Sequence, residues 1–92
     1  MRIRWTEPAV GDLTNISDYI QKHGSNASAH RVAVAICDQI SDLAKFPESG
    51  RTGRRRDTRE LPVSGLPYLA VYRIREDRVE ILRILHGAQN WT

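Results

Sequence analysis

The chain has 92 residues, 40% of them hydrophobic and 27% charged, which suits one small core and excludes a disordered chain. Its single cysteine excludes an intramolecular disulfide framework and a cysteine-rich zinc site. No apolar run is long enough to span a bilayer or to form the core of a signal peptide. We therefore expect one cytoplasmic domain over residues 1–92, with no membrane contact.

The net charge of +3 hides an asymmetry between the two halves of the chain. Residues 7–48 carry six acidic and three basic side chains, whereas residues 49–92 carry nine arginines and five acids. Arginine offers a planar fork of donors that suits phosphates and carboxylates. The basic half therefore indicates a polyanion or an acidic protein as partner, or else a solvated basic surface.

The sequence begins with the pattern of a short strand and an amphipathic helix. Residues 2–5 alternate polar and apolar side chains, which predicts a strand. Thr6 is suited to cap a helix that ends at Gly24, a residue able to adopt the left-handed conformation of a helix stop. Asp12 is placed away from the apolar face of this helix. That face consists of Ala9, Leu13, Ile16 and Ile20.

A second amphipathic helix follows directly. Ser25 or Asn26 caps it, and we expect it to run to about Lys45. Cys37 widens its apolar stripe and is interpreted as a core residue, because no basic residue lies close in sequence to activate the thiol. The stripe itself consists of Ala29, Val32, Ile36, Ile40 and Leu43.

The C-terminal half predicts an arginine-rich loop and then a three-stranded meander. The loop, residues 47–58, is interpreted as a solvated connector or as a segment lying along phosphates, and it is too short for a nucleotide-phosphate cradle. Strands are expected around residues 61–63, 68–74 and 79–86, with Pro62 marking the first as an edge strand and 68–74 as the central one. Strict alternation in the last strand places on one face Glu80, Leu82, Ile84 and His86.

The element order β-α-α-β-β-β predicts an α+β domain, a helical hairpin packed on one face of a mostly antiparallel four-stranded sheet. No cofactor is expected, and no metal site, because His23, His30 and His86 do not combine with carboxylates at a ligand spacing. The first helix is net acidic and the second carries no net positive charge, which disfavours their insertion into a nucleic-acid groove.

One chemistry that the meander suggests is metal-free RNA cleavage, which needs a base, an acid and cations around one phosphate. The candidate catalytic residues are Arg59, Glu60, Arg73, Arg83 and His86. Base-stacking aromatics are offered by Tyr68, Tyr72 and Trp91. These residues also have structural interpretations: a lone histidine at a strand end is typically a hydrogen-bonded structural residue, and Glu60 is placed to pair across strands with Arg73 or Arg83.

Several short motifs, taken in order along almost the whole chain, resemble those of one family. The helical motifs are Ala9-x3-Leu13-x2-Ile16-x2-Tyr19-Ile20 and, after the second helix, Phe46-Pro47-x2-Gly50-Arg51. The strand motifs are Thr58-Arg59-Glu60-Leu61, Gly65-x-Pro67-Tyr68, Val71-Tyr72-Arg73, Val79-x-Ile81-Leu82-x-Ile84-Leu85-His86-Gly87-Ala88 and the late Trp91. In these motifs the chain resembles the RelE/ParE superfamily of toxins from bacterial type II toxin–antitoxin modules. Within that superfamily it is most similar to the ParE-like plasmid-stabilisation branch.

The resemblance implies a cognate antitoxin whose C-terminal tail wraps around the toxin, in a hetero-oligomer that is a heterotetramer or larger. It also implies that the complex represses its own operon, with operator DNA bound only through the antitoxin. The expected antitoxin-binding residues are Leu13, Ile16, Ile20, Ile36, Ile40, Tyr68 and Tyr72.

Members of this superfamily act either on DNA gyrase or, as endonucleases, on mRNA in the ribosome. Where the nuclease branch has arginines this chain has Leu69 and Gln89, and His86 is followed by Gly87 instead of a tyrosine. The resemblance therefore favours a growth inhibitor that poisons DNA gyrase without catalysis of its own. Its expected target-binding residues are Arg83, His86, Gln89 and Trp91. The alternatives are a ribosome-dependent mRNA endonuclease using the five candidate residues above, and an inactive member that only binds the antitoxin.

Overall fold

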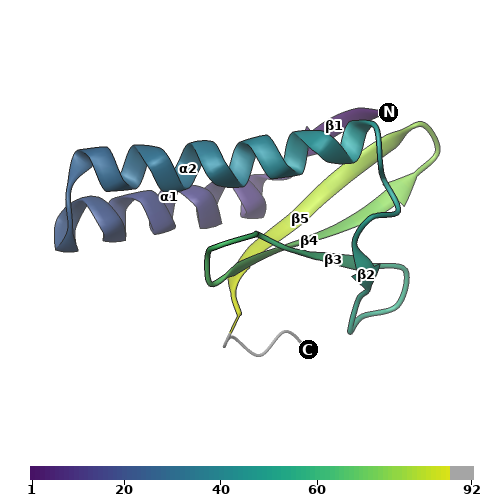
Figure 1. Ribbon diagram of the computed structural model, residues 1–92. Coiled ribbons are helices and arrows are strands. Elements are labelled where there is room, and N and C mark those ends of the chain that lie inside the picture. The colour runs from purple at the N-terminus through teal and green to yellow at the C-terminus, as the bar shows by residue number, and fades with distance from the viewer. Residues whose placement is uncertain (88–92) are drawn as a thin grey trace.

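In the computed structural model, which describes residues 1–87, a hairpin of two helices packs on one face of a five-stranded sheet (Figure 1). The helical elements are α1 (Glu7–His23), α2 (Asn26–Ser41) and the 3-10 turn η1 (Asp42–Ala44). The strands are β1 (Arg2–Trp5), β2 (Arg51–Thr52), β3 (Arg59–Pro62), β4 (Tyr68–Arg75) and β5 (Arg78–His86). Their order is β1-β5-β4-β3-β2, with β1 parallel to β5 and the other pairs antiparallel. The predicted α+β class is confirmed.

The sheet has one strand more than the four predicted, counted over residues 1–87. The additional strand is β2, a two-residue segment inside the stretch predicted as a loop, which pairs with the start of β3. Two residues are too few to show a periodicity, so only the tertiary pairing identifies them as a strand. No helix among the described residues is long and apolar enough to cross a membrane.

Both helices start at the predicted caps. The Thr6 hydroxyl accepts a hydrogen bond from the Ala9 N–H at 3.4 Å and donates to the Ile81 carbonyl at 2.7 Å, so it fastens the start of α1 to β5. The Ser25 side chain accepts from the Ser28 N–H at 3.0 Å. The second helix ends at Ser41 and not near Lys45, because the chain tightens there into the 3-10 turn η1.

The main core lies between the hairpin and the sheet. Among its fully buried residues are Ala9, Ile36, Ile40 and Leu43 from the helical layer, and Ala70, Tyr72, Val79, Ile81 and Ile84 from the sheet. The interpretation of Cys37 as a core residue is wrong, since its side chain is exposed. The buried positions of α2 are Ala29, Ile36 and Ile40, and Cys37 lies one position beyond that stripe, on the solvent side.

A second apolar cluster covers the other face of the sheet, so β4 is buried on both faces as predicted for the central strand. It consists of Leu69, Val71 and Leu85, with Leu82 packed against it. The alternation predicted for the last strand holds to Leu82 and is wrong beyond it, because Val71 pairs with Arg83 while Tyr72 pairs with Ile81. This irregularity inserts one residue into β5 and brings Ile84 onto the helix-covered face.

Candidate functional site

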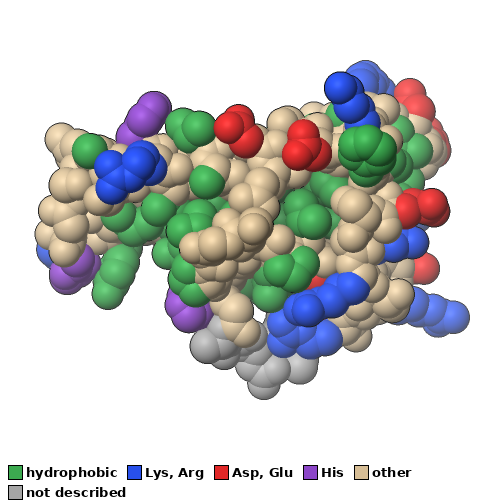
Figure 2. Space-filling view, viewed as in Figure 1, with side chains coloured by type: hydrophobic (Ala, Val, Ile, Leu, Met, Phe, Trp, Pro, Cys, Tyr) green, Lys and Arg blue, Asp and Glu red, His purple; other side chains and the backbone are tan. Residues whose placement is uncertain are grey.

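The sheet face turned away from the helices, called the open face below, is strongly basic. Strand register places there the side chains of Arg2, Arg4, Arg51, Arg73, Arg75 and Arg78, together with Glu60 and Glu80. Figure 2 shows lysine and arginine side chains gathered over the β2–β3 end of the sheet, below the helical layer. Four of these arginines were not among the predicted site residues, although the alternation of residues 2–5 already places the first two on one face: Arg2, Arg4, Arg75 and Arg78.

Glu80 organises one half of the open face. Its side chain is only 5% exposed, yet it accepts from the Nε atoms of Arg73 at 2.6 Å and of Arg78 at 3.1 Å. Arg4 approaches the same carboxylate to 3.6 Å from β1. The hydrogen bond from Arg73 is the main cause that lowers the pKa of Glu80, and it outweighs the opposing effect of burial. Glu80 therefore stays ionised and holds arginines from three strands together.

Glu60 plays the same part beside the β2–β3 connection. It accepts from the backbone N–H of Arg54 at 2.9 Å, and its side chain also meets Arg54 Nε at 3.3 Å and Arg51 at 3.4 Å. Burial by itself raises the pKa of Glu60, but the hydrogen bonds and charges of Arg54 and Arg51 lower it on balance. The predicted pairing of Glu60 with Arg73 or Arg83 is therefore wrong, because the carboxylate turns to the neighbouring loop.

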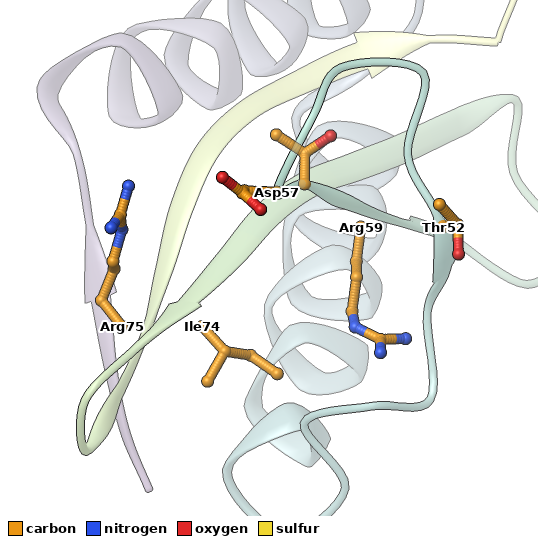
Figure 3. A pocket seen from close by; sticks show the side chains of 6 residues that line it. Thr52, Asp57, Arg59, Ile74 and Arg75 are labelled. Carbon is orange, nitrogen blue, oxygen red and sulfur yellow. The ribbon is translucent and has the colours of Figure 1, made fainter.

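Arg59 lies on the opposite face of β3 from Glu60. Its guanidinium donates to the carbonyls of Gly50 at 2.9 Å and Glu48 at 3.3 Å. It also lines a hollow of about 430 Å³, whose other residues are Thr52, Asp57, Thr58, Ile74 and Arg75. Figure 3 shows Arg59 and Arg75 at opposite sides of this hollow, with Asp57 between them in that view. The hydrogen bonds of Arg59 show that it fastens the loop that precedes β2.

Arg83 is bound to the first helix. Its Nε and Nη2 atoms donate to the two oxygens of Asp12 at 2.7 and 2.9 Å, and the Ile84 N–H donates to the same carboxylate at 2.9 Å. The hydrogen bonds to Asp12 favour the charged guanidinium and raise the pKa of Arg83. Asp12 thus faces the sheet, and its placement away from the buried side of the helix is wrong. The pair fixes α1 against the irregular part of β5.

His86 stands at the exposed end of β5, beside an aromatic hollow. Its ring meets Tyr68 edge to face, with centroids 5.8 Å apart. The two rings line a hollow of about 390 Å³ together with Asn15, Ile16 and Tyr19 of α1. Of the predicted target-binding residues, Gln89 and Trp91 lie outside the described residues 1–87.

The residues predicted to bind an antitoxin divide into two groups. Leu13, Ile16, Ile20 and Tyr68 are partly exposed and two of them line the aromatic hollow. Ile36 and Tyr72 are 0% exposed and Ile40 is 1% exposed. These three side chains are used in core packing and offer no surface to a partner.

The five candidate nuclease residues are not brought together. Glu60 and Arg73 are on the open face, Arg59 is on the other face of β3, and Arg83 is bound to α1. His86 is six residues along β5 from Glu80, the partner of Arg73, which corresponds to about 20 Å of extended chain. Within residues 1–87, no three His, Cys, Asp or Glu side chains are grouped closely enough to hold a metal ion.

A helical hairpin on one face of the sheet, a basic open face and an aromatic hollow at the strand ends characterise this small α+β domain, and the comparisons with known proteins identify it as a toxin domain of the ParE and RelE kind. The family model described as "ParE toxin of type II toxin-antitoxin system, parDE" matches residues 3–91, and the chain belongs to this family. It is therefore a toxin of the type II toxin–antitoxin class, which implies a cognate antitoxin as partner.

Three relatives support this assignment. A putative toxin from Sinorhizobium fredii, Y4kP, is 46% identical over 90 residues, covering 98% of this chain and 92% of the relative. A protein named Toxin RelE2 from Caulobacter vibrioides is 38% identical over 88 residues, covering 96% and 97%. A solved structure of a chromosomal ParDE toxin–antitoxin system from P. aeruginosa superposes with a TM-score of 0.86 at 26% identity, covering 94% and 95%.

Proposed function

We propose that this toxin inhibits growth by binding DNA gyrase, and that it has no catalytic activity of its own. The observation that carries the proposal is the separation of the five candidate nuclease residues over both faces and the far end of the sheet. Metal-free RNA cleavage requires its base, acid and cations to converge on one phosphate in a near-attack geometry. This chain has no such convergence among its described candidates.

The electrostatics of Glu60 point the same way. A general base works best when its pKa lies near the operating pH, but the arginines around Glu60 lower its pKa from a value that is already acidic. Its Oε2 atom accepts from the backbone and side chain of Arg54, and its Oε1 atom accepts from Arg51. Glu60 therefore acts as the centre of a structural ion cluster.

The proposed gyrase contact lies at the end of β5. His86 is exposed there, and the chain continues directly from it to Gln89 and Trp91. Arg83, three residues earlier, holds the strand against α1 through Asp12 and so positions this end. Arg83 therefore supports target binding as a positioning residue.

The proposed antitoxin surface is the aromatic hollow and the α1 face beside it. Tyr19 is 64% exposed, and with Ile16 and Tyr68 it leaves apolar area that a helix of the antitoxin would cover. Operator DNA is bound through the antitoxin in this scheme, and the assembly is a heterotetramer or larger.

A second candidate function is ribosome-dependent mRNA cleavage. It is favoured by the 38% identity to the protein named Toxin RelE2 and by the arginines of the open face, which suit an RNA backbone. This function would require the ribosome to bring the five separated candidate nuclease residues together, since the chain alone does not place them around one phosphate.

A purified gyrase assay tests the proposal. The toxin is expected to inhibit supercoiling and to accumulate linear plasmid DNA. Roughly tenfold more of the His86→Ala variant is expected to be needed, because an exposed side chain of the proposed gyrase contact is removed. His30→Ala is the matched control, since His30 is exposed on α2, away from β5, and is expected to act as the unchanged chain does. Full gyrase activity at excess toxin, with mRNA cut on purified ribosomes, would sink the proposal in favour of the endonuclease.

A further inference from the structure

Three arginines stand side by side on three adjacent strands. Arg2 of β1 is paired in register with Arg78 of β5, and Arg78 is paired on its other side with Arg75 of β4. Residues opposite each other in this way have Cβ atoms about 5 Å apart, and like charges there repel and destabilise the sheet. A row of three arginines therefore lowers the stability of the isolated chain. Such a destabilising arrangement calls for a functional explanation.

The row is only partly neutralised within the chain. Arg2 meets Asp77 at 3.6 Å, but both side chains are more than 70% exposed, so this pair contributes little. Arg78 shares the buried Glu80 with Arg73 and Arg4. Arg75 is exposed and has no hydrogen bond or ion pair among the described residues.

The five arginines Arg2, Arg4, Arg73, Arg75 and Arg78 are called the arginine patch below. Among the described residues they form ion pairs with two acids, Glu80 and Asp77. Glu80 has a second effect besides neutralisation. Its hydrogen bonds, at 2.6 and 3.1 Å, fix the guanidinium groups of Arg73 and Arg78 on the open face before any ligand arrives. Donors that are ordered in advance lose less entropy on binding.

An open hollow lies at the β1 edge of the patch. Its volume is about 320 Å³, and it is lined by Arg2, Ile3, Arg4 and Arg78. Three of these four side chains are cationic, and the planar donor fork of arginine matches the oxygens of a phosphate. The hollow therefore has the shape and charge of an oxyanion-binding site at one end of the arginine row.

We propose that the arginine patch binds the phosphodiester backbone of a nucleic acid. The patch holds a dense row of positive charge, and Ile3 is the single apolar side chain that lines its hollow. That combination fits a ligand with closely repeated charge and little apolar surface. An acidic peptide docks by apolar anchors as well as by charge, and the aromatic hollow that offers such anchors lies elsewhere, between α1 and His86.

The site goes beyond the proposed function, because it gives the toxin its own contact with nucleic acid, at the opposite end of β5 from His86. Contacts to phosphates carry no sequence information, so the patch is expected to accept a backbone whatever its bases. Duplex DNA and single-stranded RNA share this chemistry, and the binding experiment separates them.

The test is fluorescence anisotropy with the purified chain and two labelled probes of equal length, a duplex DNA and a single-stranded RNA, between about 50 and 200 mM salt. We expect binding to at least one probe, with an affinity that falls steeply with salt. Arg75→Ala and Arg2→Ala are each expected to weaken binding roughly three- to tenfold and to reduce the logarithmic salt slope by about 0.9, the value for one phosphate contact. Arg75→Lys is expected to retain most of the binding, because it keeps the charge.

Arg31→Ala is the matched control, because it removes one exposed arginine from α2, outside the patch. The affinity of this variant for both probes is expected to be unchanged. Tighter binding of the DNA probe identifies a duplex ligand, and tighter binding of the RNA probe identifies an RNA ligand; each supports the proposal. Absence of binding to both probes at low salt overturns it, as does an equal loss in Arg31→Ala. Tighter binding of a polyglutamate of equal length than of either probe also overturns it and assigns the patch to an acidic protein. Gyrase is absent from this assay, so its outcome is independent of the gyrase proposal.

Discussion

Asp12→Ala is expected to lower the free energy of unfolding by about 3 kcal/mol, since it removes three hydrogen bonds that join α1 to β5, two of them between charged groups. The substitution leaves the Ile84 N–H and the Arg83 guanidinium without this carboxylate. The Arg83 side chain is one-third exposed, at 33%, so water recovers part of its solvation and the loss stays below that of a fully buried pair.

Urea unfolding followed by circular dichroism measures this loss. Asp18→Ala provides the matched control, because Asp18 is an exposed residue of the same helix and its replacement is expected to change the stability by less than about 0.5 kcal/mol. Equal stability of the two variants would show that the contact between Asp12 and Arg83 does not hold α1 to the sheet.

Acid is expected to unfold the chain through its two buried glutamates, and Glu80→Gln is expected to flatten this pH dependence. The folded-state pKa of Glu80 is lowered by Arg73, so the ionised form contributes stability above the unfolded pKa of about 4.3. That contribution is lost as the pH falls through the lower folded-state pKa, because the unfolded chain binds the proton more readily. Glu80→Gln is therefore expected to cost about 2 kcal/mol at pH 7 and much less once the pH is below the folded-state pKa of Glu80.

Thermal or urea unfolding over a series of pH values provides the measurement. Glu76→Gln is the control, because Glu76 lies exposed in the turn between β4 and β5. This substitution is expected to leave the dependence of stability on pH unchanged. A Glu80→Gln variant that remained less stable by the same amount at every pH would contradict the role given to the ionised carboxylate.

The helices and the central strand were predictable because their signals are local. The spacing of Ala9, Leu13 and Ile16 fixes one face of α1, and Thr6 has the side chain that a helix cap needs. The continuous apolar run of β4 likewise predicts a strand buried on both faces. The order of these elements then determines the α+β class.

The misplaced residues depend on contacts that periodicity does not encode. Asp12 is turned inward because Arg83 lies opposite it, 71 positions later in the chain. The extra residue in β5 reverses the faces of Ile84 and Leu85, and no local pattern marks it. Arg2 joins Arg75 and Arg78 only because β1 pairs in parallel with β5, and this pairing is not visible in the local pattern of residues 2–5.

Induced expression of the chain without an antitoxin, with mRNA cleavage and the DNA-damage response read from the same culture, distinguishes gyrase poisoning from mRNA cleavage. Growth arrest, an induced DNA-damage response and intact mRNA are expected, because gyrase trapped on cleaved DNA leaves double-strand breaks. Growth arrest without a DNA-damage response, with mRNA cut at codons held in the ribosome, would contradict gyrase poisoning. Normal growth would contradict it as well.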